Sequence, residues 1–194
     1  QRLRHRLADF QNIDDAELGN QLPLPVQLFS AARNGFISKV QALLKRDPDL
    51  VYTENEDGLS ILLYAAHASH HKGYRAVPEY LVAKGAPVDF HAAAALGLHE
   101  LMTPMLKWTP EQVNRAGAWG RTPLHWAASG GHTTLVSWIL DRGAAINQAD
   151  GWGCTALHLA AELGHVDTVN LLLDRHADIH ARLKNGKTPL HVAA

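Results

Sequence analysis

Apolar residues between positions 121 and 153 fall into two short blocks, each suited to one helix. The first block ends at Gly130-Gly131, where glycine supplies the left-handed backbone that ends a helix. Thr122 suits the N-cap, and Pro123 suits the first helical position because that position needs no N–H donor. In the second block the apolar positions recur at helical spacing and share one face. The pattern predicts a helical hairpin with Leu124, Trp126, Ala127, Ala128, Leu135, Val136, Ile139 and Leu140 as its apolar residues.

The first block returns at a fixed interval along the chain. Its tetrapeptide, Thr122 to His125, returns at Thr155 to His158, with Ala156 in place of proline, and again at Thr188 to His191, and the interval is 33 residues each time. A period of this size indicates stacked structural repeats. The period, the Thr-Pro-Leu-His motif and the helical pattern together resemble the ankyrin repeat. The resemblance implies an all-α repeat solenoid, in which helix-turn-helix units are joined by β-hairpin fingers.

Counting units from this register gives about five repeats and a partial sixth, over residues 26–194. Residues 1–25 do not fit the repeat, and their apolar residues suit a capping helix on the first unit. The sequence stops at Ala194 inside a helix of the sixth unit, so we expect the native chain to continue or another molecule to cover this end. The predicted units are 26–58, 59–89, 90–120, 121–153, 154–186 and the partial unit 187–194.

Two units depart from the regular length. The helices of the second unit are separated by more residues than those of the fourth, which indicates an insertion from His67 to Tyr74. We expect this insertion to be a surface loop. Asp89 runs almost directly into the next apolar block at Phe90, so the finger between the second and third units is predicted to be absent.

Composition narrows the class of protein. The chain has 194 residues, of which 46% are hydrophobic and 19% charged, and its formal net charge is -1. This balance predicts a folded core and supplies no positive field for nucleic acid. No apolar run approaches the roughly 20 residues that cross a bilayer, so no membrane insertion is expected. Cys154 is the only cysteine, which excludes an internal disulfide framework and suits an intracellular, cytoplasmic location.

Thirteen histidines raise the question of a metal site, but most of them recur with the repeat. The ankyrin resemblance implies that His125, His158 and His191 are structural, each imidazole bonding the threonine of its motif and neighbouring backbone. His132 and His165 follow turn glycines and are expected to be structural too. Metal ligands must converge on one point, whereas these residues belong to separate stacked units.

One histidine cluster and one thiol remain as candidates for chemistry. Metal binding by His67, His70 and His71 is an alternative to the surface loop, which we favour because no Cys, Asp or Glu accompanies them. Cys154 occupies a variable finger position, and the sequence gives no reason to expect an activated thiolate. Phosphate-binding, hydrolase and zinc-protease motifs are absent from the sequence. We predict no catalytic residue, metal, cofactor or small-molecule substrate.

The variable positions of the repeat indicate the function. The resemblance implies that partners bind the concave face built from the fingers and the first helix of each unit. We therefore predict a non-enzymatic protein-protein interaction module that binds a partner protein or peptide. The alternative is a targeting or regulatory ankyrin domain of a larger enzyme or effector, whose catalytic part lies outside this chain. The predicted partner-binding residues are Trp119, Arg121, Arg142, Trp152, Glu162, Leu163, Arg175, Lys184 and Lys187.

Trp119 and Trp152 lead this set, because they lie one period apart at the tips of adjacent fingers. Two indoles in register would provide a large, rigid contact area. The alternative is that they pack on their neighbours and stiffen the fingers. Charge also differs between fingers, since residues 53–57 are acidic and residues 182–187 are basic, and this difference would orient a partner.

Two other pairs of residues are assigned from their place in the repeat. Trp126 and Trp138 stand where the next unit has leucine, so both are predicted to be core. Asn114 and Asn147 occupy the finger base, a position that resembles the site modified by asparaginyl hydroxylases in ankyrin proteins. We therefore include both as candidates for hydroxylation, with a structural role in the turn as the alternative.

Overall fold

The chain folds into a series of short helices. The computed structural model describes residues 22–72, 74–103 and 110–193. Within these ranges the regular structure is helical, apart from one isolated antiparallel bridge between Glu54 and Ser60. The helices are α2 (Leu24–Arg33), α3 (Ile37–Arg46), η2 (Pro48–Tyr52), α4 (Ile61–Lys72), α5 (Ala76–Ala83), α6 (Phe90–Leu96), α7 (His99–Met102), α8 (Pro110–Val113), η3 (Ala118–Gly120), α9 (Pro123–Ser129), α10 (Thr133–Leu140), α11 (Ala156–Glu162), α12 (Val166–Asp174) and α13 (Pro189–Val192).

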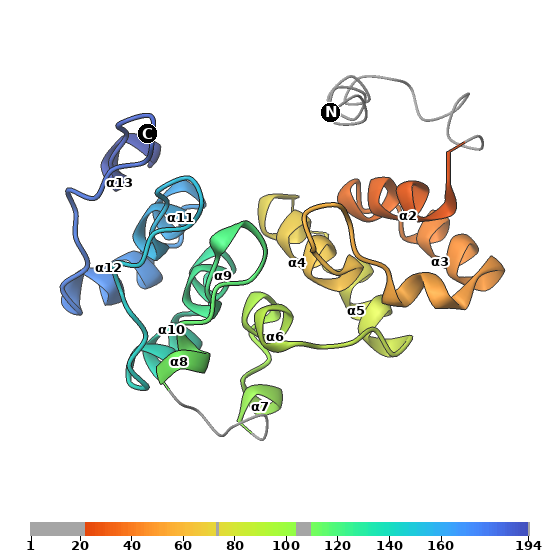
Figure 1. The fold of residues 1–194 in the computed structure, drawn as a ribbon, viewed down its shortest axis with the longest axis horizontal. Helices are drawn as coiled ribbons and strands as arrows, with labels where there is room; N and C mark the ends of the chain where they lie inside the picture. Colours follow the sequence, from red (N-terminus) through yellow and green to blue (C-terminus); the bar gives the residue numbers. More distant parts are fainter. Residues whose placement is uncertain (1–21, 73, 104–109, 194) are drawn as a thin grey trace.

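These helices form two layers (Figure 1). In the inner layer α2, α4, α6, α9, α11 and α13 each pack against the next. In the outer layer α3, α5, α7, α10 and α12 each pack against the inner helix that precedes them in sequence. Units that follow one another in sequence are therefore neighbours in space, with the N-terminal pair at the right of Figure 1 and the C-terminal helices at the left. This arrangement confirms the predicted all-α repeat solenoid.

Small side chains set the spacing of the inner layer. Residues 92–95 of α6 are four alanines, and all four are fully buried, as are Ala127 and Ala128 of α9. Their methyl groups let neighbouring helices approach closely, and the larger Leu124 and Trp126 of α9 are buried beside them. The core positions predicted for the fourth unit are buried, except Leu140, which is half-buried.

The motif histidines of the fourth and fifth units each connect that unit to the next, while His191 bonds Thr188 of its own motif. In the fourth unit the backbone N–H of Thr122 donates to Nδ1 of His125 (3.1 Å), so the proton of the neutral ring is on Nε2. That Nε2–H donates to the carbonyl of Cys154 in the following unit (3.0 Å). His158 repeats both bonds, with Thr155 and with the carbonyl of Lys187. The structural role predicted for these histidines is confirmed.

A second set of histidines connects the inner helices at their other end. Nε2 of His132 donates to the carbonyl of Ala95 (2.9 Å), and Nε2 of His165 donates to the carbonyl of Ser129, also at 2.9 Å. Each imidazole therefore reaches back to the preceding inner helix. These contacts confirm that both histidines are structural.

Residues 67–72 of the predicted insertion are helical, so the surface loop expected there is wrong. Helix α4 continues to Lys72, and the side chains of His67 and His70 are half-buried. Nε2 of His70 donates to the carbonyl of Ala95 (2.7 Å), which also accepts from His132. These packing contacts stabilise the extra helical turn, whereas an exposed loop would leave the imidazole in water. The side chain of His71 lies outside the described part of the structure.

The connection between the second and third units agrees with the sequence. Only residues 84–89 separate α5 from α6, and Asp89 caps α6 by accepting a hydrogen bond from the N–H of Ala92 (2.7 Å). The predicted absence of a finger here is confirmed. Most of the predicted N-terminal segment, residues 1–21, lies outside the described residues, and α2 begins at Leu24. The division of the chain into numbered units stays a prediction.

Removing one bridging imidazole should destabilise the fold. In His158→Ala the N–H of Thr155 loses its acceptor and the carbonyl of Lys187 its donor, so the free energy of unfolding should fall by about 1–3 kcal/mol. His180→Ala is the control, because His180 is exposed, and its effect should stay within about 0.5 kcal/mol. Urea denaturation measures both. Equal losses from the two variants would contradict the role of the bridge.

Acid should weaken the fold through the same imidazoles. Burial lowers the pKa of His125, His132 and His158 below the ordinary histidine value. The unfolded chain therefore binds protons that the folded chain excludes. The stabilisation is complete above the unfolded pKa of about 6.5 and is lost as the pH falls through the folded pKa values.

The urea midpoint should be lower at about pH 5.5 than at about pH 7.5. His132→Gln provides a matched variant, because its side-chain amide keeps an N–H donor for the Ala95 carbonyl but cannot titrate. The midpoint of this variant should change less with pH. A parent protein with equal midpoints at both pH values would show that these imidazoles do not contribute.

Candidate interaction surface

Three finger turns have the same construction. The N–H of Gly117 donates to the carbonyl of Arg121, and the N–H of Asp150 donates to that of Cys154. The third turn repeats this bond between Leu183 and Lys187. Because the bonds recur at one repeat spacing, they hold the three finger tips in register.

Backbone bonds also join each finger to the next. The N–H of Gly151 donates to the carbonyl of Trp119, and the N–H of Lys184 donates to the carbonyl of Trp152, both at 2.9 Å. The fingers at residues 117–121, 150–154 and 183–187 therefore form one connected row, which we call the finger row.

The two finger tryptophans touch each other but differ in exposure. Their ring centroids are 5.7 Å apart and the ring planes meet at 67°, an edge-to-face contact. Trp119 is half-buried, and it also contacts the rings of His67 (5.2 Å) and Trp126 (5.9 Å). Trp152 is 49% exposed. Trp119 therefore supports the indole of Trp152, which presents a free face to solvent.

A buried ion pair lies beneath these rings. Nε of Arg121 is 3.1 Å from Oδ2 of Asp150, and both side chains are almost entirely buried. Oδ1 of Asp150 accepts from the N–H groups of Trp152 (2.8 Å) and Cys154 (2.9 Å). One carboxylate thus neutralises the guanidinium and also shapes the turn that carries Trp152.

Three indoles surround the guanidinium of Arg121. Its Cζ lies 5.3, 5.0 and 5.9 Å from the ring centroids of Trp119, Trp126 and Trp152. Nη1 of Arg121 and Nε1 of Trp126 are buried, and neither finds a hydrogen-bond partner among the described residues. Cation–π attraction offsets part of this loss. The prediction that Arg121 contacts a partner has to be corrected, because its guanidinium lies under the surface.

The comparison with protein families agrees with this architecture. Residues 90–182 match the family model for ankyrin repeats, as three copies. Residues 90–182 of the chain are ankyrin repeats. No curated protein matches the sequence. Ankyrin repeats generally act as protein-protein interaction modules and are typically non-catalytic. Among the described residues, no helix of this ankyrin-repeat chain is long and apolar enough to cross a membrane.

Two further arginines lie in the outer layer of the ankyrin solenoid, away from the predicted face. Cζ of Arg142 is 3.7 Å from the ring centroid of Trp138, and its Nη1 donates to the carbonyl of that residue. Arg175 pairs with Asp141 at 2.8 Å. Both arginines follow the second helix of their unit, which is why they are not on the finger and inner-helix face. Trp138 itself is half-buried and packs against the hydrophobic core.

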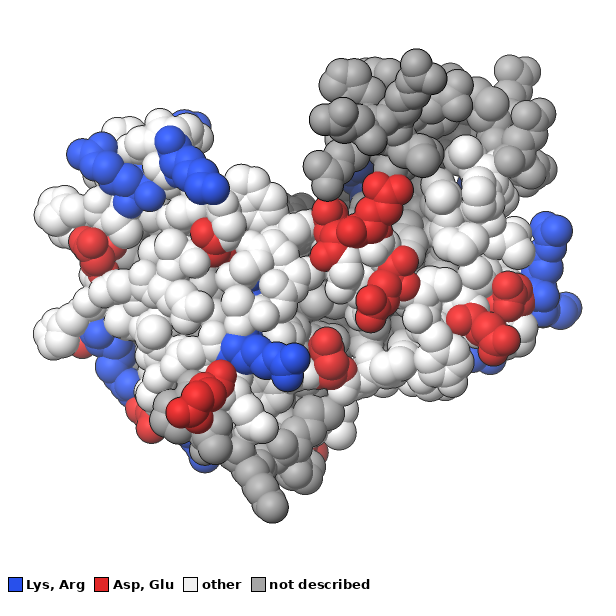
Figure 2. Space-filling model, in the orientation of Figure 1, with Lys and Arg blue, Asp and Glu red and all other residues white. Residues whose placement is uncertain are grey.

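The remaining predicted residues lie on the fingers and the inner layer. Glu162 ends α11 and is exposed, and Leu163 after it is half-buried. Lys184 and Lys187 are exposed on the last finger. Figure 2 shows basic side chains around α13 at the C-terminal end and acidic side chains toward the N-terminal half. The charge difference expected between the first and last fingers is therefore present at the surface.

Both finger-base asparagines bind backbone of the following unit. Asn114 donates from Nδ2 to the carbonyl of Gly143 (3.0 Å) and accepts from the N–H of Ala145 (2.7 Å). Oδ1 of Asn147 accepts from the N–H of Asp178 (2.8 Å). These bonds support a structural role in the turn. Hydroxylation of the two residues stays a prediction.

The thiol of Cys154 is not set up as a nucleophile. Burial raises its pKa to about 12, and the negative charges of Asp150 and Glu162 act in the same direction, while Arg121 opposes them. The thiol therefore stays protonated near neutral pH. Within the described part of the chain, no group of three or more His, Cys, Asp or Glu side chains is arranged to hold a metal ion.

Sequence reasoning missed the residues beneath the finger row. Asp150 and His67 were not among the candidates, although they contact Arg121 and Trp119 respectively. The sequence did contain a sign of the ion pair, because Asp150 lies in the finger that follows Arg121, where a carboxylate could pair with an arginine. Nothing in the sequence indicated His67, because the rings that it contacts, Trp119 and Trp126, lie far along the chain.

Removing the carboxylate of Asp150 should destabilise the protein strongly. Asp150→Asn leaves the guanidinium of Arg121 buried without an opposite charge, so we expect a loss of about 3 kcal/mol in urea denaturation. Asp141→Asn is the control, because it removes the exposed pair with Arg175 and should lower stability by less than about 1 kcal/mol. Similar small losses from both variants would contradict the role of the buried pair.

Proposed function

We propose that this ankyrin-repeat chain is a non-catalytic module that binds a partner protein or peptide on its fingers and inner helices. The observation that carries the proposal is the indole of Trp152, which is 49% exposed at the centre of the finger row. Its backbone is fixed on both sides, by the carboxylate of Asp150 and by the N–H of Lys184.

A fixed, exposed indole is well suited to binding. Tryptophan is enriched among the few interface residues that carry most of the binding energy. Trp152 rests edge-on against Trp119, so its side chain is already held in place and loses little conformational entropy when a partner binds. The same exposure is unfavourable in the free protein, where apolar surface meets water. Covering this ring is therefore a gain that only a partner would supply.

Charge around Trp152 favours an acidic partner surface. Lys184 and Lys187 lie exposed on the next finger, and a backbone bond joins Lys184 to Trp152. We propose that these two lysines and Trp152, together with Glu162 and Leu163 of the inner layer, form the contact surface. A partner with an apolar pocket and an acidic rim would match it, and the charges would speed association more than they raise affinity.

The test is a comparison of two alanine variants against partners recovered by affinity purification and mass spectrometry. Trp152→Ala should raise the dissociation constant of a true partner about 30-fold or more, the effect expected of a hot spot. Leu173→Ala is the control, because Leu173 is also exposed (40%) but belongs to outer helix α12. This control should bind like the parent.

Stability of the variants separates binding from folding. Trp152→Ala should keep the helical circular dichroism signal, because the ring is half in solvent and lies outside the helices. A partner that binds the Trp152 variant as tightly as the parent would contradict the proposed surface. An equal loss of affinity in the Leu173→Ala variant would also contradict it.

A further inference from the structure

The finger row has an open end where the second finger is absent. Gly151 and Lys184 occupy equivalent positions, 33 residues apart, and each donates its N–H to the carbonyl of the preceding finger. The equivalent residue one repeat earlier is Ala118. Its N–H has no hydrogen-bond partner within the described ranges, because the chain passes from α5 to α6 through residues 84–89 without forming a finger.

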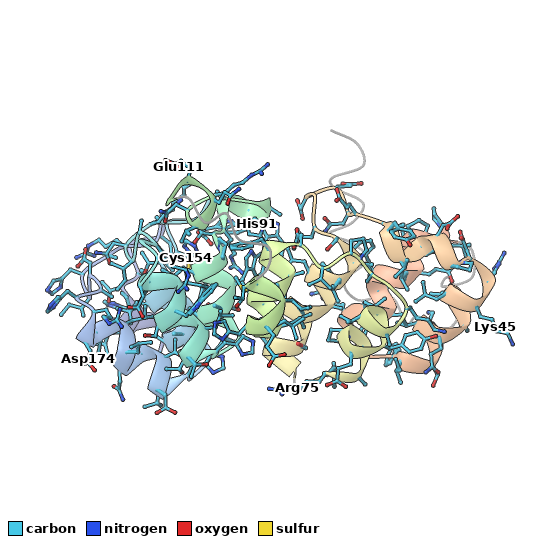
Figure 3. All side chains as sticks on the ribbon, turned by 90° about the horizontal axis from the view of Figure 1, so that it is seen from below. Lys45, Arg75, His91, Glu111, Cys154 and Asp174 are labelled. Atoms are coloured by element: carbon cyan, nitrogen blue, oxygen red, sulfur yellow. The ribbon has the colours of Figure 1, made fainter. Side chains whose placement is uncertain are left out.

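A cavity of about 460 Å³ lies at this end of the row. Its walls are the start of α6, from Asp89 to His91, and the turn after α8, with Gln112 and residues 115–117. Figure 3 shows His91 and Glu111 of α8 on the same side of the molecule, opposite Arg75 and Asp174. We call this cavity and the adjacent N–H of Ala118 the finger notch.

The walls of the finger notch are held together and carry one exposed charge of each sign, from Asp89 and Arg115. Nε2 of His91 donates to the carbonyl of Arg115 (3.0 Å), which ties α6 to the opposite wall. The carboxylate of Asp89 accepts from the N–H of Ala92, which fixes it at the start of α6. The guanidinium of Arg115 is exposed and forms no ion pair with any residue of the described ranges. The notch therefore offers a backbone donor, a cation and the half-buried ring of Phe90.

We propose that the finger notch binds an extended segment of a partner protein that carries an acidic side chain. A backbone carbonyl of the segment accepts from the N–H of Ala118, as the missing finger would, and its carboxylate pairs with Arg115. Addition of an extended segment to an open row of backbone donors is a common mode of peptide recognition. The volume is within the range of ligand pockets. This site is separate from the surface around Trp152 and goes beyond the proposed function.

The experiment selects linear peptides displayed on phage against the immobilised protein. Enriched peptides should share an Asp or Glu. Their dissociation constants should rise about tenfold or more in Arg115→Glu, which reverses the charge, and in Ala118→Pro, which removes the N–H donor. Proline is suitable there, because Ala118 is the first residue of η3.

Two control variants keep the finger notch intact. Arg142→Glu reverses an exposed charge in the outer layer, and Trp152→Ala removes the other candidate surface. Neither should change the affinity of the selected peptides. If Ala118→Pro fails to fold by circular dichroism, Arg115→Lys replaces it, and this variant should keep most of the affinity that Arg115→Glu loses.

The possible results are distinguishable. Acidic peptides that are lost in the Arg115 and Ala118 variants but kept in both controls support the notch. Peptides that bind the Arg115→Glu variant as tightly as the parent overturn it. Peptides lost only in the Trp152 variant also overturn it, while they support the separate function proposed for that surface. A selection that enriches no acidic peptide counts against the notch as well.

Discussion

The stacking of the C-terminal units depends on two hydrogen bonds made by the neutral imidazole of the repeated motif. His125 accepts from Thr122 on one nitrogen and donates to the carbonyl of Cys154 on the other, so a single tautomer satisfies both units. The first bond caps an inner helix, and the second fixes the position of the next finger. Because the same residue performs both tasks, helix start and finger position are coupled in the fourth and fifth units, which carry His125 and His158. Burial keeps the ring uncharged and the geometry in place.

The two irregularities of the second unit are related through their contacts. The absent finger removes one backbone connection from the finger row, and the extended α4 supplies side-chain contacts to the following units. His67 reaches the rings of Trp119 and Trp126, and His70 bonds the carbonyl of Ala95. The extra helical turn therefore connects the second unit to the third and fourth. Side-chain contacts take over where the backbone connection between fingers is missing.

Beneath the finger row, one ion pair connects stability to the exposed surface. Arg121 and Asp150 come from successive fingers, and the carboxylate also holds the turn of Trp152. Ion pairs this deeply buried contribute little net stability compared with apolar packing. What this pair adds is position, because it holds an exposed indole in one orientation. The proposed binding surface is thus a consequence of polar groups that a partner never touches.

Local order followed from the sequence alone. The 33-residue period, the Thr-Pro-Leu-His motifs and the helical spacing predicted the solenoid, the structural histidines and the absent finger, because caps and helices depend on residues a few positions apart.

The tertiary structure decided which of the predicted binding residues reach solvent. Arg121 is buried because Asp150, 29 residues away, faces it, and Trp119 is half-buried because His67 of α4 packs against it. Arg142 and Arg175 lie in the outer layer because the second helix of each unit turns away from the fingers. Such contacts join distant residues, so no local pattern in the sequence reveals them.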